Sequence, residues 1–301
     1  MPPSLTLDCD VIVVNYNAGK LIGECVASAL REGASRVIVV DNASSDASLG
    51  FLDAFLASGR LSIVRNTRNM GFASACNTGM GISDAGALLF LNPDCVLMPH
   101  SLQCMMQALH GDPATGMVGG FLCNPDGSEQ PGGRRVFPTP RRAFVRAFGL
   151  SRLDRLFPSL CSDFLLHREP LPAAPVAVEA ISGACMLVKR EALEPVGLWD
   201  EGYFLHCEDL DWCMRFKLQQ WRVVFVPQAH VMHWRGACSR HRPFFVEWHK
   251  HRGMVRFYQK FFRAQYPKWL WCWVILGVWL RFGMISTYHA FKWGLRRGRG
   301  A

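Results

Sequence analysis

The 301-residue sequence lacks the cysteine spacing of a metal or disulfide scaffold. None of its twelve cysteines forms a Cys-x-x-Cys pair, and most lie within apolar segments, as Cys76, Cys95, Cys185 and Cys272 do. This pattern favours reduced core thiols in a cytosolic protein over a zinc site or disulfides. The first ten residues carry no basic cluster, and the apolar residues 11–14 are too few for a signal peptide, so we expect none.

Acidic residues are scarce at the C-terminal end. From Arg235 to Ala301, Glu247 is the single acid beside fourteen lysines and arginines, which gives this segment a charge of +13 and leaves −4 on the rest. Such asymmetry suits an anionic surface, either nucleic acid or a membrane leaflet. The ten tryptophans and twenty phenylalanines are many for a purely soluble enzyme, which favours the membrane.

A long uncharged run is also missing from this end. Residues 269–280 are twelve without a charge, and the count reaches seventeen at Ile285 only by including Arg281, whereas a membrane span needs roughly 20. We therefore expect a helix lying in the membrane interface after a basic, aromatic, amphipathic helix at 243–263. A helix packed on the core or on a second copy is the alternative. The residues suited to the interface are Trp269, Trp271, Trp273, Trp279, Lys292, Arg296, Arg297 and Arg299.

Short apolar runs alternate with amphipathic segments over the first 110 residues, which predicts an α/β fold with a mostly parallel sheet. Residues 124–175 hold eight of the seventeen prolines and are expected to be a long insertion. We expect one domain at 1–240 and a basic, aromatic helical extension at 241–301. The predicted strands are 10–14, 36–40, 61–64, 87–91, 117–122, 184–188 and 222–226, and the helices 20–31, 48–57, 72–83 and 100–109.

Polar side chains follow the first two predicted strands. Asn15-Tyr16-Asn17 ends the first strand and Asp41 ends the second, at the sheet edge where ligands of parallel sheets bind. Asp41 could accept hydrogen bonds from a nucleotide base or ribose, because it lies too early to cap the next helix, for which Ser45 or Asp46 is suited. The asparagines alone are equally consistent with an ordinary turn.

Two further turns carry candidate ligands. Arg68-Asn69-Met70-Gly71-Phe72-Ala73 leads into a helix bearing Asn77, and Gly71 would permit close backbone approach by a phosphate at the helix N-terminus. Asn92-Pro93-Asp94 ends the fourth strand, and a carboxylate there can hold Mg²⁺ or Mn²⁺ against a diphosphate. A simple Pro-containing turn that presents Asp94 is the alternative.

A later helix opens with three acids, and its expected buried stripe is Leu210, Met214 and Leu218. Capping and an Asp211–Arg215 pair account for acids at this position, or one of Glu208 and Asp209 is a general base. The spacing does not choose between those two. His230 or His233, after the strand at 222–226, could complete a metal site, although a lone histidine is more often structural.

Taken together, seven ordered blocks between Val11 and His233 resemble the family 2 glycosyltransferases, inverting enzymes of the GT-A fold, a Rossmann-like, mostly parallel sheet flanked by helices. The stretch Gly133-Arg134-Arg135-x-Phe137-Pro138-Thr139 and the whole pattern look most like the bacterial rhamnosyltransferase branch. The blocks are Asn15-Tyr16-Asn17, Val40 to Asp46, Arg68 to Ala73, Asn92-Pro93-Asp94, Ile181 to Ala184, Gly197 to Glu201, and Glu208-Asp209-x-Asp211.

The resemblance implies a role for each matched residue. Asp209 would be the catalytic base with Glu208 in support, and Asp94 and His233 would hold Mg²⁺ or Mn²⁺, with Asn92 replacing the first acid of the family's Asp-x-Asp. The residues expected to bind the nucleotide sugar are Asn15, Asn17, Asp41, Asn42, Asn69, Gly71, Asn77 and Asn92. Those expected on the acceptor side are Gly183, Ala184, Trp199, Asp200, Arg134 and Arg135.

The resemblance also implies the activity. We expect an inverting transferase that moves a sugar, first of all rhamnose from dTDP-rhamnose, to a hydroxyl of a polyprenyl-linked or polysaccharide acceptor in cell-envelope synthesis. It would work at the cytoplasmic face of the inner membrane, without nucleic acid and in the form of a monomer or homodimer. The alternatives are a UDP-sugar enzyme of the same fold and a non-catalytic membrane-surface protein. A sugar-1-phosphate nucleotidyltransferase would need a Gly-rich basic loop that residues 15–20 lack.

Overall fold

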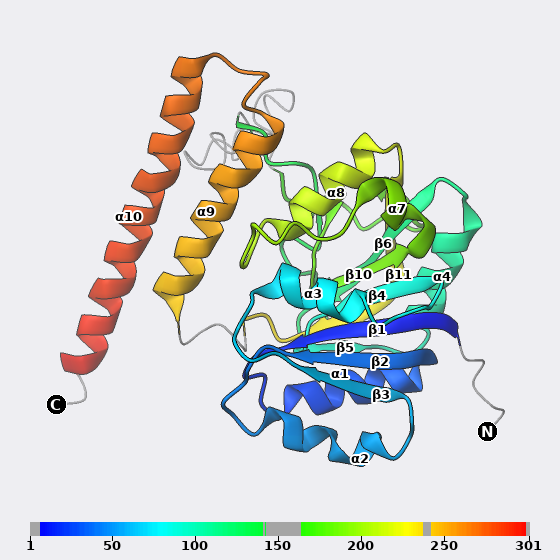
Figure 1. The fold of residues 1–301 in the computed structure, drawn as a ribbon. Helices are drawn as coiled ribbons and strands as arrows, with labels where there is room; N and C mark the ends of the chain where they lie inside the picture. The colour runs from blue at the N-terminus through cyan, green and yellow to red at the C-terminus, as the bar shows by residue number, and fades with distance from the viewer. Residues whose placement is uncertain (1–6, 141, 143–163, 237–241, 299–301) are drawn as a thin grey trace.

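The computed structural model describes residues 7–140, 142, 164–236 and 242–298, and its centre is a mixed sheet of nine strands (Figure 1). Seven strands occur where the sequence predicts them. In sheet order the path is β3 (Leu61–Arg65), β2 (Ala34–Asp41), β1 (Leu7–Asn15), β4 (Ala87–Leu91), β10 (Cys185–Lys189), β6 (Thr115–Cys123), β11 (Arg222–His233) and β5 (Cys95–Leu97), and β8 (Val176–Val178) pairs with β11.

The first four predicted strands form the parallel part of the sheet, as expected. β10 then inserts between β4 and β6 and runs antiparallel to both, while β6 and β11 are parallel to each other. The segments β7 (Arg134–Arg135) and β9 (Ala180–Ile181) form a separate two-stranded sheet. The antiparallel β10 brings the loop before it to the carboxyl ends of β1 and β4.

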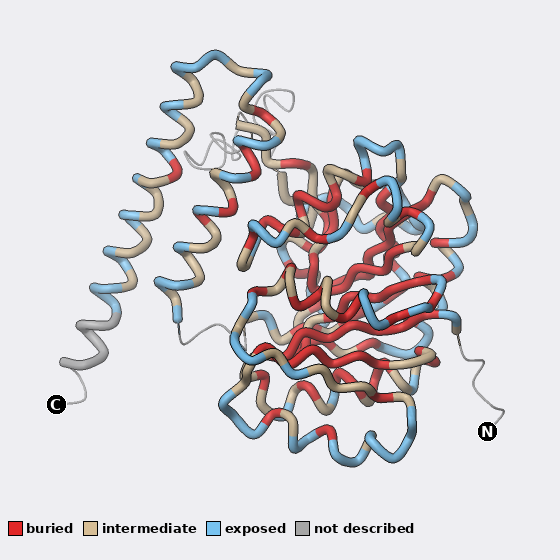
Figure 2. The backbone as a smooth tube through the Cα atoms, in the orientation of Figure 1, coloured by how far each residue is buried: buried red, intermediate tan, exposed pale blue. Residues whose placement is uncertain are grey.

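Helices cover both faces of the sheet, so its strands are buried on both sides (Figure 2). Val11 and Val13 of β1 pack on the side of α1 (Leu21–Arg31) and α4 (Ser101–Gly111). Ile12 and Val14 pack on the side of α3 (Phe72–Met80) and α8 (Glu208–Leu218). The expected helix at 48–57 is a 3₁₀ turn, η1 (Ser48–Leu52), followed by the short α2 (Asp53–Leu56). A second 3₁₀ turn, η3 (Arg190–Ala192), and α7 (Leu193–Val196) follow β10.

The buried face of α8 differs from the predicted stripe. Leu210 is buried, but Leu218 is 64% exposed, and Trp212 and Phe216 fill the core instead. Asp211 also turns inward, because its carboxylate is paired with Arg215 at 2.7 Å, the ion pair that the spacing predicted. A paired carboxylate in the interior thus rotates the helix away from the face that its leucines alone would choose.

The C-terminal end forms two helices that lie side by side, α9 (Pro243–Phe261) and α10 (Lys268–Gly298), with α9 between α10 and the sheet domain (Figure 1). The expected short apolar helix is wrong in length, since residues Lys268–Lys292 are long and apolar enough to cross a membrane by length and composition. The charge that interrupted the run is partnered: Arg281 Nη1 lies 2.9 Å from His251 Nε2 on α9.

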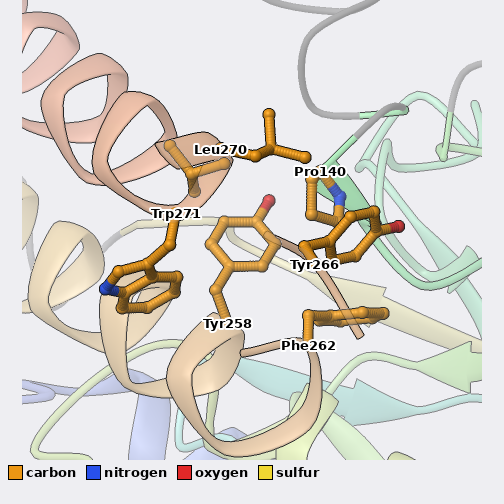
Figure 3. Close-up of a pocket in the computed structure, with 7 residues that line it drawn as sticks. Pro140, Tyr258, Phe262, Tyr266, Leu270 and Trp271 are labelled. Atoms are coloured by element: carbon orange, nitrogen blue, oxygen red, sulfur yellow. The ribbon is translucent and has the colours of Figure 1, made fainter. Parts of the chain in front are cut away.

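The junction of α9 and α10 encloses a small apolar pocket between Tyr258, Phe262, Leu270 and Trp271 (Figure 3). None of the candidate site residues lines it, so we interpret it as packing. Among the described cysteines, Cys76, Cys95 and Cys185 are buried free thiols, as predicted. Cys272 is also free, but it is exposed on α10 rather than buried in a core.

Candidate functional site

The ends of β1 and β2 form one hydrogen-bonded network, which we call the donor rim and define by Asn15, Asn17, Asp41, Ser44 and Ser48. The Asn15 amide nitrogen donates to the Asp41 carboxylate at 2.8 Å, to Ser44 Oγ at 3.1 Å and to Ser48 Oγ at 2.8 Å. Asn15 and Asp41 are register partners on the two strands. Both are buried, and Asn15 Oδ1 has no partner among the described residues.

Asn17 closes the donor rim from the loop after β1. Its backbone adopts a positive φ of 54°, and its side-chain oxygen accepts the amide hydrogens of Ser45 at 2.8 Å and Asp46 at 3.2 Å. Asp46 in turn accepts the amide of Ser48 at 3.1 Å, where η1 begins, but the N-cap residue of η1 is Ala47, so neither Ser45 nor Asp46 occupies the cap position that the sequence predicted. The loop between strand and helix is therefore held in one shape.

The loop before α3 is organised by its own amides rather than left open for phosphate. Asn42 donates to the Gly71 carbonyl at 3.0 Å, and Asn69 accepts the Gly71 amide at 2.9 Å. The first amide of α3, that of Phe72, donates to the Phe204 carbonyl at 2.9 Å. Gly71 has φ 87°, and a Cβ there would lie 2.8 Å from the Phe204 oxygen, so glycine is required by this close contact.

Asn77 is placed away from the donor rim. Its side chain exchanges two hydrogen bonds with the backbone of Trp199, each 3.0 Å long, and donates to Glu201 at 2.9 Å. These bonds connect α3 to the segment before α8. They use the polar atoms that a nucleotide would need, and the predicted nucleotide-binding role of Asn77 is not retained.

The end of β4 and the end of β11 bring two potential metal ligands together. Asp94 Oδ1 lies 3.3 Å from His233 Nε2, and both side chains are at most 10% exposed. Pro93 lies in a turn closed by a 3.0 Å bond from the Cys95 amide to the Asn92 carbonyl, so the predicted turn is present and presents Asp94. Cys95 is within reach of the same point, but its sulfur is a soft ligand, which hard cations such as Mg²⁺ and Mn²⁺ disfavour.

Gln130 fixes how His233 is presented. Its amide nitrogen donates to the His233 carbonyl at 2.6 Å and to Asn124 Oδ1 at 3.0 Å, so its oxygen is the acceptor. That oxygen lies 2.8 Å from His233 Nδ1, which places the ring hydrogen on Nδ1 in the neutral tautomer. Nε2 then directs a lone pair at the Asp94 carboxylate, an arrangement that a cation between them would stabilise. The residues therefore fit a divalent metal.

The loop before β10 joins this turn to α8. The Ala184 carbonyl accepts the Asn92 amide at 2.9 Å, and the preceding residue, Gly183, donates its amide to Asp209 Oδ2 at 3.2 Å. Through this one dipeptide, the candidate metal turn and the candidate base belong to the same site. We call the group of Asn92, Asp94, Gly183, Ala184, Asp209 and His233 the reaction rim.

Asp209 and Glu208 stand side by side in different environments. Asp209 is 14% exposed, and Arg135 Nη2 lies 2.5 Å from its Oδ2. Burial is the largest influence and opposes ionisation of Asp209, but the charge and hydrogen bond of Arg135, together with the amides of Gly183 and Leu210, outweigh it and lower the pKa of this carboxyl. Glu208 is buried with Oε2 unpartnered among the described residues, and burial followed by the charge of Asp209 raises its pKa. Asp209 is therefore the member of the pair that is ionised at neutral pH.

The turn that presents these acids is strained. His206 and Cys207, directly before α8, have φ values of 69° and 71°, in the left-handed region that non-glycine residues seldom adopt. Consecutive residues of this kind persist only when the surrounding structure holds them, and such strain clusters at functional sites. The turn is accordingly part of the site.

Comparison with known families agrees with this geometry. The family described as "Glycosyl transferase family 2" matches residues 10–196 of the chain. The chain belongs to this family. The expectation of a glycosyltransferase enzyme is thereby confirmed, and the reading as a non-catalytic surface protein is wrong.

Curated relatives of the glycosyltransferase include rhamnosyltransferases, which confirms the resemblance to that branch. The N-acetylglucosaminyl-diphospho-decaprenol L-rhamnosyltransferase of Mycobacterium tuberculosis is 29% identical over 236 residues, covering 74% of this chain and 75% of that protein. Rhamnosyltransferase WbbL of Escherichia coli is 33% identical over 108 residues, covering 32% of this chain and 40% of the relative.

Solved structures confirm the expected GT-A fold. GalNAc-T7, determined with UDP, GalNAc and Mn²⁺, superposes with a TM-score of 0.59 at 18% identity, covering 86% of this chain and 48% of that one. The mannosyltransferase PcManGT of Pyrobaculum calidifontis, determined with GDP-Man and Mn²⁺, gives a TM-score of 0.57 at 17% identity and covers 95% of this chain and 76% of that one.

Three residues expected on the acceptor side of the glycosyltransferase have structural partners instead. Arg134 is 4% exposed and bonds to both carboxylate oxygens of Glu129. Trp199 is 2% exposed, and its ring centre lies 4.1 Å from that of Trp212. Asp200 is held by Arg256 at 2.8 Å and Lys260 at 2.8 Å, both from α9. Arg134 and Asp200 are not retained as acceptor ligands because their charges are paired, and Trp199 is not retained because it is buried against Trp212.

Sequence reasoning missed Gln130 and Lys260. Gln130 is separated from His233 by 103 residues, and Lys260 from Asp211 by 49. No local pattern marks either residue, since a glutamine in a loop and a lysine on a basic helix are ordinary. Arg135 was expected near the acceptor, and the structure places it directly on Asp209.

Proposed function

We propose that this glycosyltransferase moves rhamnose from dTDP-rhamnose, with inversion, to a hydroxyl of a polyprenyl-diphosphate-linked or polysaccharide acceptor in cell-envelope synthesis. The observation that carries the transfer chemistry is the Gly183–Ala184 dipeptide, which bonds to Asp209 on one side and to the Asn92 turn on the other. The rhamnosyltransferase relatives support the donor, and the decaprenol in the name of one supports a lipid-linked acceptor.

In this proposal Asp209 is the general base. The Asp209 carboxylate takes the proton of the acceptor hydroxyl, whose oxygen forms a bond to the anomeric carbon from the face opposite the nucleoside diphosphate. The bond from that carbon to the diphosphate oxygen breaks, and its electron pair leaves with the diphosphate. Gly183 and Arg135 hold Asp209 in position, and the ion pair with Arg135 keeps it ionised before the substrate arrives.

The donor rim and the metal ligands would bind the nucleotide. Asn15, Asn17 and Asp41 are proposed to face the base and ribose, with Asn42, Asn69 and Gly71 shaping the neighbouring loop. Asp94 and His233 would hold Mg²⁺ or Mn²⁺, which would neutralise charge on the leaving diphosphate. Asn92 in place of an acid leaves the ion with one carboxylate from this turn.

The C-terminal helices are proposed to keep the enzyme at the cytoplasmic face of the inner membrane. The Lys268–Lys292 segment is apolar and only 6% buried, and Trp269 and Trp273 are 65% and 64% exposed. Exposed tryptophans beside a net charge of +9 for the chain suit an interface with anionic headgroups. We also propose a domain boundary between residues 240 and 241 and a homodimer that forms through the exposed helices.

A donor panel tests the function. The full chain is incubated with dTDP-rhamnose, UDP-glucose, UDP-GlcNAc and GDP-mannose, with and without Mn²⁺ or Mg²⁺, using a polyprenyl-diphosphate-linked GlcNAc acceptor. We expect metal-dependent transfer from dTDP-rhamnose, and NMR of the product should show an inverted anomeric centre. Preference for a UDP-sugar would overturn the donor but keep the mechanism, and a retained configuration would overturn the role of Asp209.

A further inference from the structure

Helix α9 lies along the segment that leads into the catalytic turn. Phe204 stacks on His249 of α9 with ring centres 4.4 Å apart, and Arg256 pairs with Asp200 at 2.8 Å. The Arg256 guanidinium also lies 5.3 Å from the centre of the Tyr203 ring. Figure 1 shows α9 between α10 and the sheet domain, on the side from which α8 begins. The helix thus contacts this segment at several successive points.

A close backbone contact between α9 and this segment is at Gly253. A Cβ at this position would lie 2.6 Å from the His206 carbonyl oxygen and 3.2 Å from the Cys207 Cβ. His206 and Cys207 are the two residues with left-handed backbone angles directly before Glu208 and Asp209. Only the absence of a side chain lets the backbone of α9 rest against the strained turn, and this contact restrains the turn from the outside.

Lys260, two turns further along α9, reaches the other side of the base. Its Nζ lies 2.7 Å from Asp211 Oδ2 and 2.8 Å from Asp200 Oδ2. The Asp211 side chain is fully buried and also accepts from Arg215 and from the Tyr203 hydroxyl at 3.2 Å. Asp211 is only two residues beyond Asp209. Helix α9 therefore contacts the chain both before Asp209, at His206 and Cys207, and after it, at Asp211.

We infer that α9 is a positioning segment for the catalytic base, with Gly253 and Lys260 as the positioning residues. Neither residue touches the proposed substrate; both determine where α8 starts and therefore where the Asp209 carboxylate points. A general base acts only within hydrogen-bond reach, and a displacement of about 1 Å can lower the rate about 100-fold. This inference rests on the proposed function of Asp209 as the base.

Helix α9 also packs against α10. His251, fully buried on α9, accepts from Arg281, and Trp248 packs on Trp279 with ring centres 5.2 Å apart. The base and the apolar helix α10 therefore share α9 as their common support. The positioning contacts and the α10 contacts fall on different residues of α9, so the two can be altered separately.

The test compares three variants of the full chain. Gly253→Ala adds one methyl group against the turn, Lys260→Met removes the charge at similar length, and Gln259→Ala changes an exposed neighbour on the same helix as a control. We expect kcat to fall at least 10-fold in the first two, with the KM for the nucleotide sugar within about twofold of wild type. Lys260→Arg should recover much of the activity, and Gln259→Ala should match wild type.

Hydrogen–deuterium exchange on the same proteins separates this inference from the proposed function. We expect faster exchange in the peptide 203–212 for Gly253→Ala and Lys260→Met, with the donor-rim peptide 10–20 unchanged. Wild-type kcat and unchanged exchange in both variants would overturn the inference while the function stands. A fall in kcat that is accompanied by weaker donor binding and a lower melting temperature would also overturn it, because α9 would then only support the fold. A wild-type chain that transfers no sugar, with the exchange pattern as expected, would overturn the function alone.

Discussion

The donor rim and the reaction rim lie at neighbouring strand ends but are built from different interactions. In the donor rim, the Asn15 amide and the hydroxyls of Ser44 and Ser48 form short bonds that are mostly between neutral groups. At the reaction rim, Asp209 pairs with the opposite charge of Arg135, and the neighbouring Glu208 keeps an oxygen that has no partner in the part of the chain that the structure describes. Neutral bonds fix a shape, whereas charges in a partly buried place set protonation states and thereby chemistry.

The largest difference between the two rims should follow from Asp209→Asn. The change keeps the shape of the side chain but removes the basic carboxylate, so we expect kcat to fall about 10²- to 10⁴-fold. Donor affinity, measured by tryptophan fluorescence titration with dTDP, should remain within about twofold, because the donor rim is untouched. Turnover that survives this substitution would place the base elsewhere.

Measurements of Mn²⁺ affinity should distinguish the metal ligands of the reaction rim from the residue that orients them. His233→Ala should abolish measurable Mn²⁺ binding in the presence of dTDP, followed by calorimetry or by the Mn²⁺ EPR signal. Gln130→Leu leaves the ligands in place but frees the imidazole, and we expect a loss of about 10- to 100-fold in affinity.

His230→Ala is the matched control for the metal measurement. His230 lies on the same strand as His233, but its ring packs against Phe121 with centres 4.9 Å apart. Its substitution should leave Mn²⁺ affinity unchanged. Equal losses in the His230 and His233 variants would mean that the strand, rather than a ligand, had been disturbed.

In the donor rim, Asn15→Ala should affect the fold and donor binding more than the chemical step. The substitution removes the side-chain donor to Asp41 Oδ1 and Ser48 Oγ, while Ser44 Oγ keeps the Asn17 amide, and we expect the free energy of unfolding to fall by about 2 kcal/mol. The KM for the nucleotide sugar should rise several-fold while kcat changes little. The exposed Ser45→Ala is the control, and a fall in kcat with unchanged KM would contradict the assignment of the two rims.

The last comparison concerns the pH dependence of stability. Burial, and after it the charge of Asp209, raise the pKa of Glu208 from 4.5 to about 8. Between these values the native protein keeps a proton that the unfolded chain has released, so stability falls as the pH rises through this window. Glu208→Gln should remove that contribution. The melting temperature of this variant should therefore rise relative to that of wild type between about pH 5 and about pH 8. Parallel curves for the two proteins would show that Glu208 titrates normally.

Local signals were sufficient for much of the fold. The strands β1 to β4 are continuous apolar runs that end on polar residues, and their edges differ from prediction by a few residues. The Pro93 turn and the Asp211–Arg215 pair each involve residues close in the chain. The order of the family's blocks also located Asp94, Asp209 and His233, although their roles remain proposals.

The errors arose where a side chain's partner is distant in sequence. Asn77 was expected at the nucleotide, but it bonds to Trp199, 122 residues away. Leu218 was expected to be buried, but the inward-facing Asp211 rotates α8. The apolar C-terminal run was counted as short because Arg281 interrupted it, and the partner of that charge, His251, lies on another helix.

The sequence by itself determined the α/β alternation, the polar strand ends, the family and the cationic, tryptophan-rich end, because each is a periodicity, a motif order or a sum of charges along the chain. Only the tertiary structure decided that Asp209 rather than Glu208 is the ionised acid, that Gln130 orients His233, and that α9 packs against the turn before Asp209. Protonation and orientation depend on burial and on charges within a few ångströms, and these are set by residues that approach one another only when the chain has folded.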